Sequence, residues 1–171
     1  MLPRRTLGIT LAGAALLAGC ANAQTGGAMA GGAAAGGPAE LRASALQGGM
    51  FLMQSAELGI QKATRADVKR FAQFEAAEQQ SIVQAMQIAG QPAMQMPLPA
   101  QKATMLQSLQ AASGTEFDRM FVQAQTMGHQ EALQVYSAIQ NSSAAPTTDR
   151  VIATLAVTTI REHLVLLQLL G

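Results

Sequence analysis

Both histidines of the chain, His129 and His163, lie within apolar stripes of predicted helices. Each stripe repeats at the three- and four-residue spacing that places side chains on one helix face. A third predicted helix carries Glu75 and Gln79 one turn apart in its own stripe, and Gln125 shares the stripe of His129. A buried polar group costs about 1–3 kcal/mol unless it is hydrogen-bonded, so we expect these side chains to meet. The predicted buried polar cluster consists of Glu75, Gln79, His129 and His163.

Two chemical interpretations of this cluster stay open. In the first, Glu75 and Gln79 hydrogen-bond the two imidazoles and nothing else binds. In the second, Glu75, His129 and His163 hold a single transition metal ion, since neutral imidazoles and a carboxylate inside a helical bundle suit such an ion. A two-metal centre is not expected, because such centres use several carboxylates and Glu-x-x-His pairs, and no glutamate precedes either histidine by three residues.

The ten methionines raise the possibility of copper binding, because thioethers suit Cu(I). Met94 and Met96, in a proline-rich segment, form the only close pair in an open position. Methionines on predicted helices are interpreted as core-filling side chains. The sequence has no G-x-S-x-G motif, P-loop or dinucleotide-binding glycine motif, so no enzymatic activity is predicted.

The elements that must position these residues are all predicted to be helices. Alanine, glutamine, leucine and methionine dominate, which is a helical composition, and no strand pattern is present. The predicted helices span residues 38–62, 64–90, 100–112, 115–141 and 148–170. This pattern predicts an all-α protein: an antiparallel bundle of four long helices with one short extra helix in the connection between the second and the fourth.

Local signals also predict helix ends and faces. Thr64 is expected to cap the second helix, and Thr148 with Asp149 the last one. The pair Gly48–Gly49 is expected to weaken or kink the first helix. The buried stripe expected on residues 148–170 consists of Ile152, Ala156, Thr159, His163, Leu166 and Leu170.

The N-terminus has the pattern of an export signal. A positive segment with Arg4 and Arg5 precedes a short apolar run, and Leu17-Ala18-Gly19-Cys20 is typical of a lipobox. We therefore predict a signal peptide over residues 1–19, lipid attachment at Cys20, and a periplasmic location with outer-membrane anchoring. The alternative is cleavage after Ala23, which would release a soluble periplasmic protein.

The remaining chain is predicted to divide into a flexible Gly/Ala tether over residues 20–38 and one bundle domain over residues 39–171. Without Arg4 and Arg5, the chain has nine basic and ten acidic residues, and aromatic residues make up only 4% of the chain. This composition argues against nucleic-acid binding. The expected contact is with the membrane, through the lipid; no protein partner is indicated.

Several short motifs occur in order along residues 41–170. They are Lys62-Ala63, Val68-Lys69-Arg70-Phe71-Ala72, Gly114-Thr115-Glu116-Phe117-Asp118, His129 and Glu162-His163-Leu164. Together they resemble the predicted outer-membrane proteins catalogued as domain of unknown function 4142. The resemblance implies a ferritin-like helical bundle, export and no established activity.

The chain departs from that family at the polar positions. Where members usually place an aspartate and a histidine after the Phe-Ala motif, this sequence has Glu75, Glu78 and Gln79. The glutamate common on the family's first helix falls near Leu52, which cannot bind a metal. If the family's polar cluster binds metal, this member has lost two candidate ligands, one of which Glu75 could replace.

These observations predict an exported envelope lipoprotein with a non-enzymatic structural or stress-associated role and no cofactor. The alternative is a periplasmic, metal-binding, ferritin-like protein. Metal analysis of the purified protein distinguishes the two.

Overall fold

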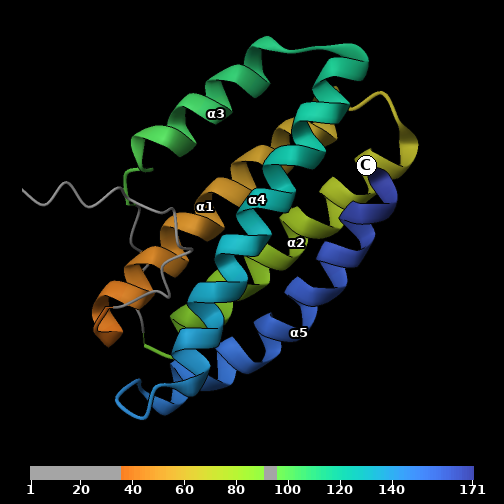
Figure 1. The fold of residues 1–171 in the computed structure, drawn as a ribbon. Coiled ribbons are helices and arrows are strands. Elements are labelled where there is room, and N and C mark those ends of the chain that lie inside the picture. Colours follow the sequence, from red (N-terminus) through yellow and green to blue (C-terminus); the bar gives the residue numbers. More distant parts are fainter. Residues whose placement is uncertain (1–35, 91–95) are drawn as a thin grey trace, which may run out of the picture. The chain divides into compact units, whose positions relative to one another are not determined.

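The computed structural model describes residues 36–90 and 96–171, and all regular secondary structure in these ranges is helical. Along the chain the helices are α1 (Pro38–Lys62), α2 (Ala66–Ile88), α3 (Ala100–Ala111), α4 (Gly114–Asn141) and α5 (Thr147–Leu170) (Figure 1). The predicted all-α class is therefore confirmed, with helix ends within about two residues of those expected. The predicted signal peptide, Cys20 and nearly all of the predicted tether lie outside the described residues.

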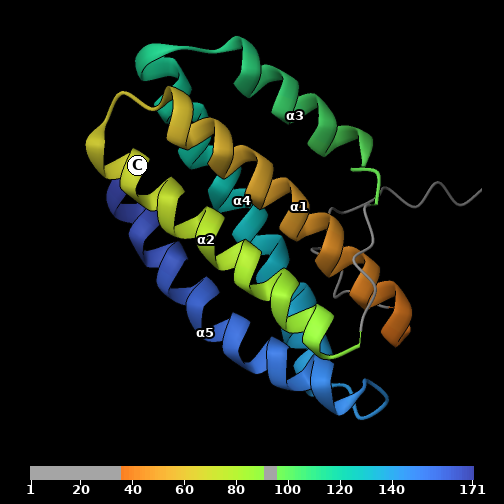
Figure 2. The same cartoon turned by 180° about the vertical axis from the view of Figure 1, so that it is seen from behind.

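The long helices α1, α2, α4 and α5 pack side by side in a helical bundle. α1 packs against α2 and α4, and α5 packs against α4 and, less closely, α2. Neighbours run antiparallel, whereas α2 and α4 run in the same direction (Figures 1 and 2). This parallel pair arises because α3 carries the chain back along the outside of the bundle, where it contacts α1 and α4.

The α3 helix is attached to the bundle by two lysines. Lys62, at the end of α1, donates to the main-chain oxygen of Gln110 at the last turn of α3. Lys102 of α3 forms an ion pair with Glu131 of α4, and its ammonium group lies 4.9 Å from the centre of the Phe51 ring. These contacts hold the connection between α2 and α4 against the bundle.

The buried face of α5 differs from the predicted stripe. Leu166, expected inside, is 44% exposed, whereas its neighbour Leu167 is 1% exposed. The buried face also includes Ala153, Val157 and Ile160, so it is rotated relative to a stripe drawn through His163. Among the described helices, α5 is also the one long and apolar enough to cross a membrane by length and composition, and a third of its most apolar stretch is buried in the protein.

The expected weakness at Gly48–Gly49 does not interrupt α1, which is continuous across both residues. A Cβ atom on Gly49 would lie 2.9 Å from the Oε1 atom of Gln79. The missing side chain therefore lets α2 bring a carboxamide against α1. Tertiary packing here outweighs the intrinsic helix cost of glycine, which is about 1 kcal/mol.

The predicted cap of α2 is wrong. The helix begins at Ala66, its N-cap residue is Arg65, and Thr64 makes no cap. The Thr64 hydroxyl donates instead to Asp118 of α4, which also accepts the main-chain N–H groups of Thr64 (3.0 Å) and Arg65 (3.1 Å). A carboxylate from another helix thus binds Thr64 and the main chain just before α2, and the Thr64 hydroxyl is not used as a cap.

The predicted cap of α5 is wrong for a similar reason. The helix begins at Thr147, with Pro146 as its N-cap residue and no side-chain cap. The Asp149 carboxylate accepts hydrogen bonds from the guanidinium of Arg42 on α1, with 3.0 Å to Nε. Asp149 therefore connects two helices and does not close its own first turn.

Candidate metal centre

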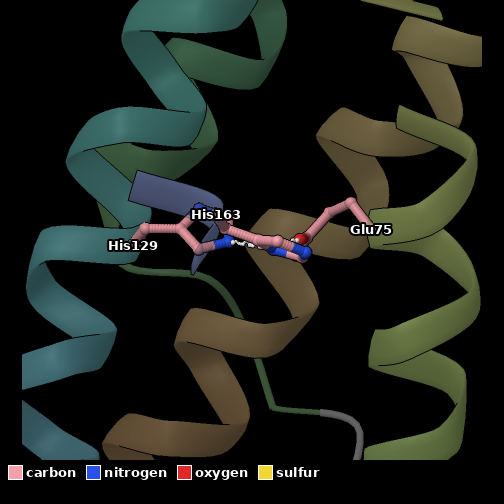
Figure 3. A group of neighbouring side chains, drawn as sticks. All are labelled: Glu75, His129 and His163. Atoms are coloured by element: carbon pink, nitrogen blue, oxygen red, sulfur yellow. Dashed lines mark hydrogen bonds and ion pairs between the residues drawn. The ribbon is translucent and has the colours of Figure 1, made fainter. Parts of the chain in front are cut away.

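Three ionisable side chains from three helices converge inside the bundle (Figure 3). Glu75 comes from α2, His129 from α4 and His163 from α5. Their exposed fractions are 0%, 1% and 7%. None lies in the first or last turn of its helix, so the packing of the long helices brings the three together.

The nearest atoms of these side chains form an almost equilateral triangle. The Oε2 atom of Glu75 lies 3.1 Å from Nε2 of His129 and 2.9 Å from Nδ1 of His163. The two ring nitrogens are 3.0 Å apart. The histidines therefore present different nitrogens, Nε2 and Nδ1, to the same point.

The other side of each group is also occupied. Nδ1 of His129 lies 2.8 Å from the main-chain oxygen of Gln125, which can only accept, so this nitrogen carries a proton. Nε2 of His163 lies 3.2 Å from a carboxylate oxygen of Glu78. Gln79 donates through Nε2 to the Oε1 atom of Glu75 at 2.9 Å. All three side chains are thus oriented from outside the triangle.

These outer bonds leave a surplus of lone pairs inside the triangle. A neutral His129 that is protonated at Nδ1 presents a lone pair at Nε2, and the facing oxygen of Glu75 also has only lone pairs. Two acceptors 3.1 Å apart cannot bond each other. A further proton in the cluster, carried by His129 or His163 and donated to Glu75, removes this conflict, and so would a metal ion between the three atoms.

The pKa values of Glu75 and His163 shift in opposite directions, and both shifts favour the charged form. Burial raises the pKa of Glu75, but hydrogen bonds from His129 and His163, together with their charges, outweigh burial and bring it to about 2. Burial lowers the pKa of His163, but the hydrogen bond to Glu75 and the charges of Glu75 and Glu78 raise it overall. The site therefore stabilises a carboxylate next to a positive charge.

Two further side chains near the cluster, Glu78 and Tyr136, have raised pKa values, mainly because they are buried. Burial is the main cause that raises the pKa of Glu78. The charge of Glu75 raises it further, and the charge of His163 opposes this rise. Burial, and then the charges of Glu78 and Glu75, raise the pKa of Tyr136 to about 12. A cation entering the triangle meets two carboxylates within one helical turn of α2, which favours its binding.

The donor set and its spacing fit a divalent transition metal ion. With metal–ligand bonds of about 2.0–2.2 Å, neighbouring ligands lie about 2.9 Å apart on an octahedron and about 3.4 Å apart on a tetrahedron. The triangle has sides of 2.9–3.1 Å, which corresponds to one octahedral face. Ligating histidines commonly donate their second ring N–H to a carbonyl or carboxylate, as the outer contacts here allow.

Two further buried side chains, Phe71 and Gln125, lie one turn before Glu75 and one turn before His129. The ring of Phe71, one turn before Glu75, lies 5.1 Å from the ring of His163 and 6.1 Å from that of His129, between centroids. Gln125 donates to the main chain of α1 at Leu52 (3.1 Å), and its Oε1 atom has no hydrogen-bond partner among the described residues. The ring of Phe71 thus packs against both imidazoles, whereas the carboxamide of Gln125 binds α1.

The structure brings together all members of the predicted buried polar cluster, with one difference in connectivity. Gln79 bonds Glu75 and neither histidine. The contact of Glu78 with His163 was missed by sequence reasoning. The available signal was the spacing, because Glu75 and Glu78 are three residues apart and so share a helix face.

Three other methionines, on α3 and α4, lie together in the described residues. Met94 lies outside the described residues, so the structure leaves the Met94–Met96 pair untested. Met105 of α3 with Met120 and Met127 of α4 instead line a cavity of about 350 Å³ between the two helices. Each is partly buried and packs against the hydrophobic core, as expected of core-filling side chains.

Comparison with known proteins gives one match. The family model described as Domain of unknown function (DUF4142) matches residues 23–170. No curated protein matches the chain. No solved structure matches it either.

Proposed function

The chain belongs to the family described as domain of unknown function DUF4142, and from that premise we propose that its bundle binds one divalent transition metal ion. Glu75, His129 and His163 are the proposed ligands. The observation that carries the proposal is their triangle of ligand atoms, with sides of 2.9–3.1 Å, whose lone pairs converge on one point where a metal ion would bind. The proposal assigns binding and no turnover.

We further propose that the architecture is a ferritin-like four-helix bundle. The support is the chain path: two antiparallel pairs, α1–α2 and α4–α5, joined by a long connection that makes α2 and α4 parallel. Bundles of this kind hold metals with side chains of facing helices. Within the described residues α1 adds no ligand to the cluster, which favours one ion over the two that such bundles hold with more carboxylates.

The proposed location is the cell envelope, with a lipid on Cys20. The support is the lipobox, followed by a Gly/Ala segment long enough to separate the bundle from a membrane surface. A metal-binding bundle tethered there would retain a metal ion close to the membrane, in line with a structural or stress-associated role. Changing Cys20→Ala should move the protein from the membrane fraction to the soluble periplasm; unchanged membrane partition would contradict lipid anchoring.

The second candidate is a bundle in which the cluster holds only a proton. It is favoured by the placement of His163 between Glu75 (2.9 Å) and Glu78 (3.2 Å), since one imidazolium would satisfy both carboxylates. Under this alternative the protein is a metal-free structural component of the envelope.

Metal analysis decides between the two. Protein stripped with a chelator is offered Mn²⁺, Fe²⁺, Co²⁺ and Zn²⁺ separately, and bound metal is measured after gel filtration. We expect about one equivalent of at least one metal. Glu75→Gln and His163→Ala should lose it, whereas Glu57→Gln, at an exposed position of α1, should retain it. Absence of stoichiometric metal in the unmodified protein, or its retention in Glu75→Gln, contradicts the proposal.

A further inference from the structure

Glu78 holds the side of His163 that faces away from the triangle. Its Oε2 atom lies 3.2 Å from Nε2 of the imidazole, while Glu75 lies 2.9 Å from Nδ1 of the same ring. Glu75 and Glu78 are neighbours on one face of α2. The helix therefore contacts both ring nitrogens of a histidine that α5 supplies.

The contact decides which nitrogen of His163 can bind a metal. A neutral imidazole has one N–H and one lone pair, and the nitrogen with the lone pair is the ligand. An acceptor at Nε2 stabilises the N–H there and leaves the lone pair on Nδ1, inside the triangle. Without that acceptor, the proton is free to occupy Nδ1 and block the ligand position.

The two histidines differ in the acceptor that lies beside their outer ring nitrogen. His129 is oriented by the main-chain oxygen of Gln125, one turn earlier on its own helix, at 2.8 Å. No substitution of a side chain removes that acceptor. His163 depends on a side chain from another helix, so its orientation rests on one replaceable residue.

We propose that Glu78 is a positioning residue of the metal centre, which keeps the N–H of His163 on Nε2 and thereby presents Nδ1 to the metal. This inference rests on the proposed function. Outer-shell acceptors of this kind change metal affinity by about 10–100-fold when they are removed. Glu78 itself stays outside the ligand set, because its carboxylate lies on the far side of the ring.

The test is Co²⁺ binding to the full-length protein and three variants, with affinity and stoichiometry measured by titration calorimetry. Glu78→Ala removes the acceptor and should weaken binding about 10–100-fold with one ion still bound. Glu78→Gln keeps an acceptor oxygen and should restore most of the affinity. Glu162→Ala is the matched control, because the exposed Glu162 also acts on His163 through its charge but, unlike Glu78, places no carboxylate oxygen beside Nε2 of the ring.

A second measurement separates positioning from a structural effect. In the Co²⁺-loaded protein each ligating imidazole should give one paramagnetically shifted, exchangeable N–H resonance. Glu78→Ala should lose or broaden the resonance of His163 and leave that of His129 in place. A loss of fold stability alone would affect both resonances alike.

The outcomes distinguish this inference from the proposed function. If the unmodified protein binds Co²⁺ but Glu78→Ala binds it equally well, the positioning role is wrong and the metal site stands. If Glu78→Gln and Glu162→Ala are weakened as much as Glu78→Ala, charge and not the acceptor oxygen beside Nε2 is responsible, and the positioning role is again wrong. If the unmodified protein binds no Co²⁺, Mn²⁺, Fe²⁺ or Zn²⁺, both proposals fail.

Discussion

Two adjacent layers of the bundle are held together by different forces. In one layer the aromatic rings of Phe71, Phe117 and Phe121 pack at centroid distances of 6.1–6.3 Å. In the next layer Glu75 and His129 meet, together with the histidine of α5, at 2.9–3.1 Å. Phe71 belongs to both layers, since its ring also contacts both imidazoles.

The two layers differ in how their stability depends on the pH and on a bound ion. Removal of apolar area from water stabilises the aromatic layer at any pH and without a bound ion. Desolvation destabilises the polar layer unless opposite charges or hydrogen bonds compensate. A bundle that only needed stability could have filled both layers with apolar side chains, so the polar layer is the part of the core to which the proposed metal ion, or the alternative buried proton, applies.

The largest effect is expected in the aromatic layer. Phe117→Ala should lower the free energy of unfolding by about 3–5 kcal/mol, because it empties a fully buried site. Phe74→Ala, the same change at a side chain that is 61% exposed, should change it by less than about 0.5 kcal/mol. Denaturant unfolding of the metal-free proteins measures both. Equal effects at the two positions would mean that the aromatic layer is not the stabilising core.

Metal should stabilise the polar layer by mass action. At a free metal concentration 100 times Kd, the free energy of unfolding should rise by about 2.7 kcal/mol and return when a chelator removes the ion. Glu75→Gln should remove this response, whereas Phe74→Ala should keep it. Thermal unfolding with and without metal gives the comparison. A response that survives Glu75→Gln would place the metal elsewhere.

Truncation within the metal-free polar layer should cost less than truncation in the aromatic layer. His129→Ala should lower the free energy of unfolding by about 1–3 kcal/mol, because it leaves Glu75 and His163 buried without one of their polar partners. His129→Leu should cost less, since leucine fills the space. Both substitutions should abolish stabilisation by metal. If His129→Ala leaves the metal-free stability unchanged, the contacts of His129 contribute nothing to the fold.

The smallest effect is a dependence on pH that should reverse when metal is present. The lowered pKa of Glu75 contributes stability above its unfolded value of about 4.3, and this contribution is lost as the pH falls toward about 2. The raised pKa of His163 contributes stability below about 6.5, and this contribution is lost as the pH rises through its folded value. Metal-free stability should therefore be highest between about pH 4.3 and 6.5.

Above about pH 6.5 the metal-bound and metal-free proteins should diverge. Each unit by which the pKa of His163 is raised corresponds to about 1.4 kcal/mol that the metal-free protein loses on deprotonation. Metal binding requires the deprotonated nitrogen, so stabilisation by metal should increase over the same range. Unfolding curves from pH 4 to 9 test both trends, with His163→Ala as the control that should flatten them. Parallel curves with and without metal would contradict a shared site for proton and metal.

Helix positions and polar stripes were accessible from the sequence, because they depend on local spacing. The stripe with Val122, His129 and Tyr136 could be read from the 3.6-residue period alone, and these side chains are buried. The same reasoning chose the wrong side of α5 at Leu166, because a stripe drawn through one polar residue does not fix the centre of a buried face. That centre depends on which neighbouring helix packs most closely.

The sequence by itself determined an all-helical chain and the presence of Glu75, Gln79, His129 and His163 in apolar stripes, since helix formation and its periodicity are local properties. Only the tertiary structure decided that Asp118 satisfies the main chain before α2, and that Glu78 orients His163. Hydrogen bonds between helices join residues tens of positions apart. Their partners are set by how the helices are rotated and shifted against one another, which no local pattern encodes.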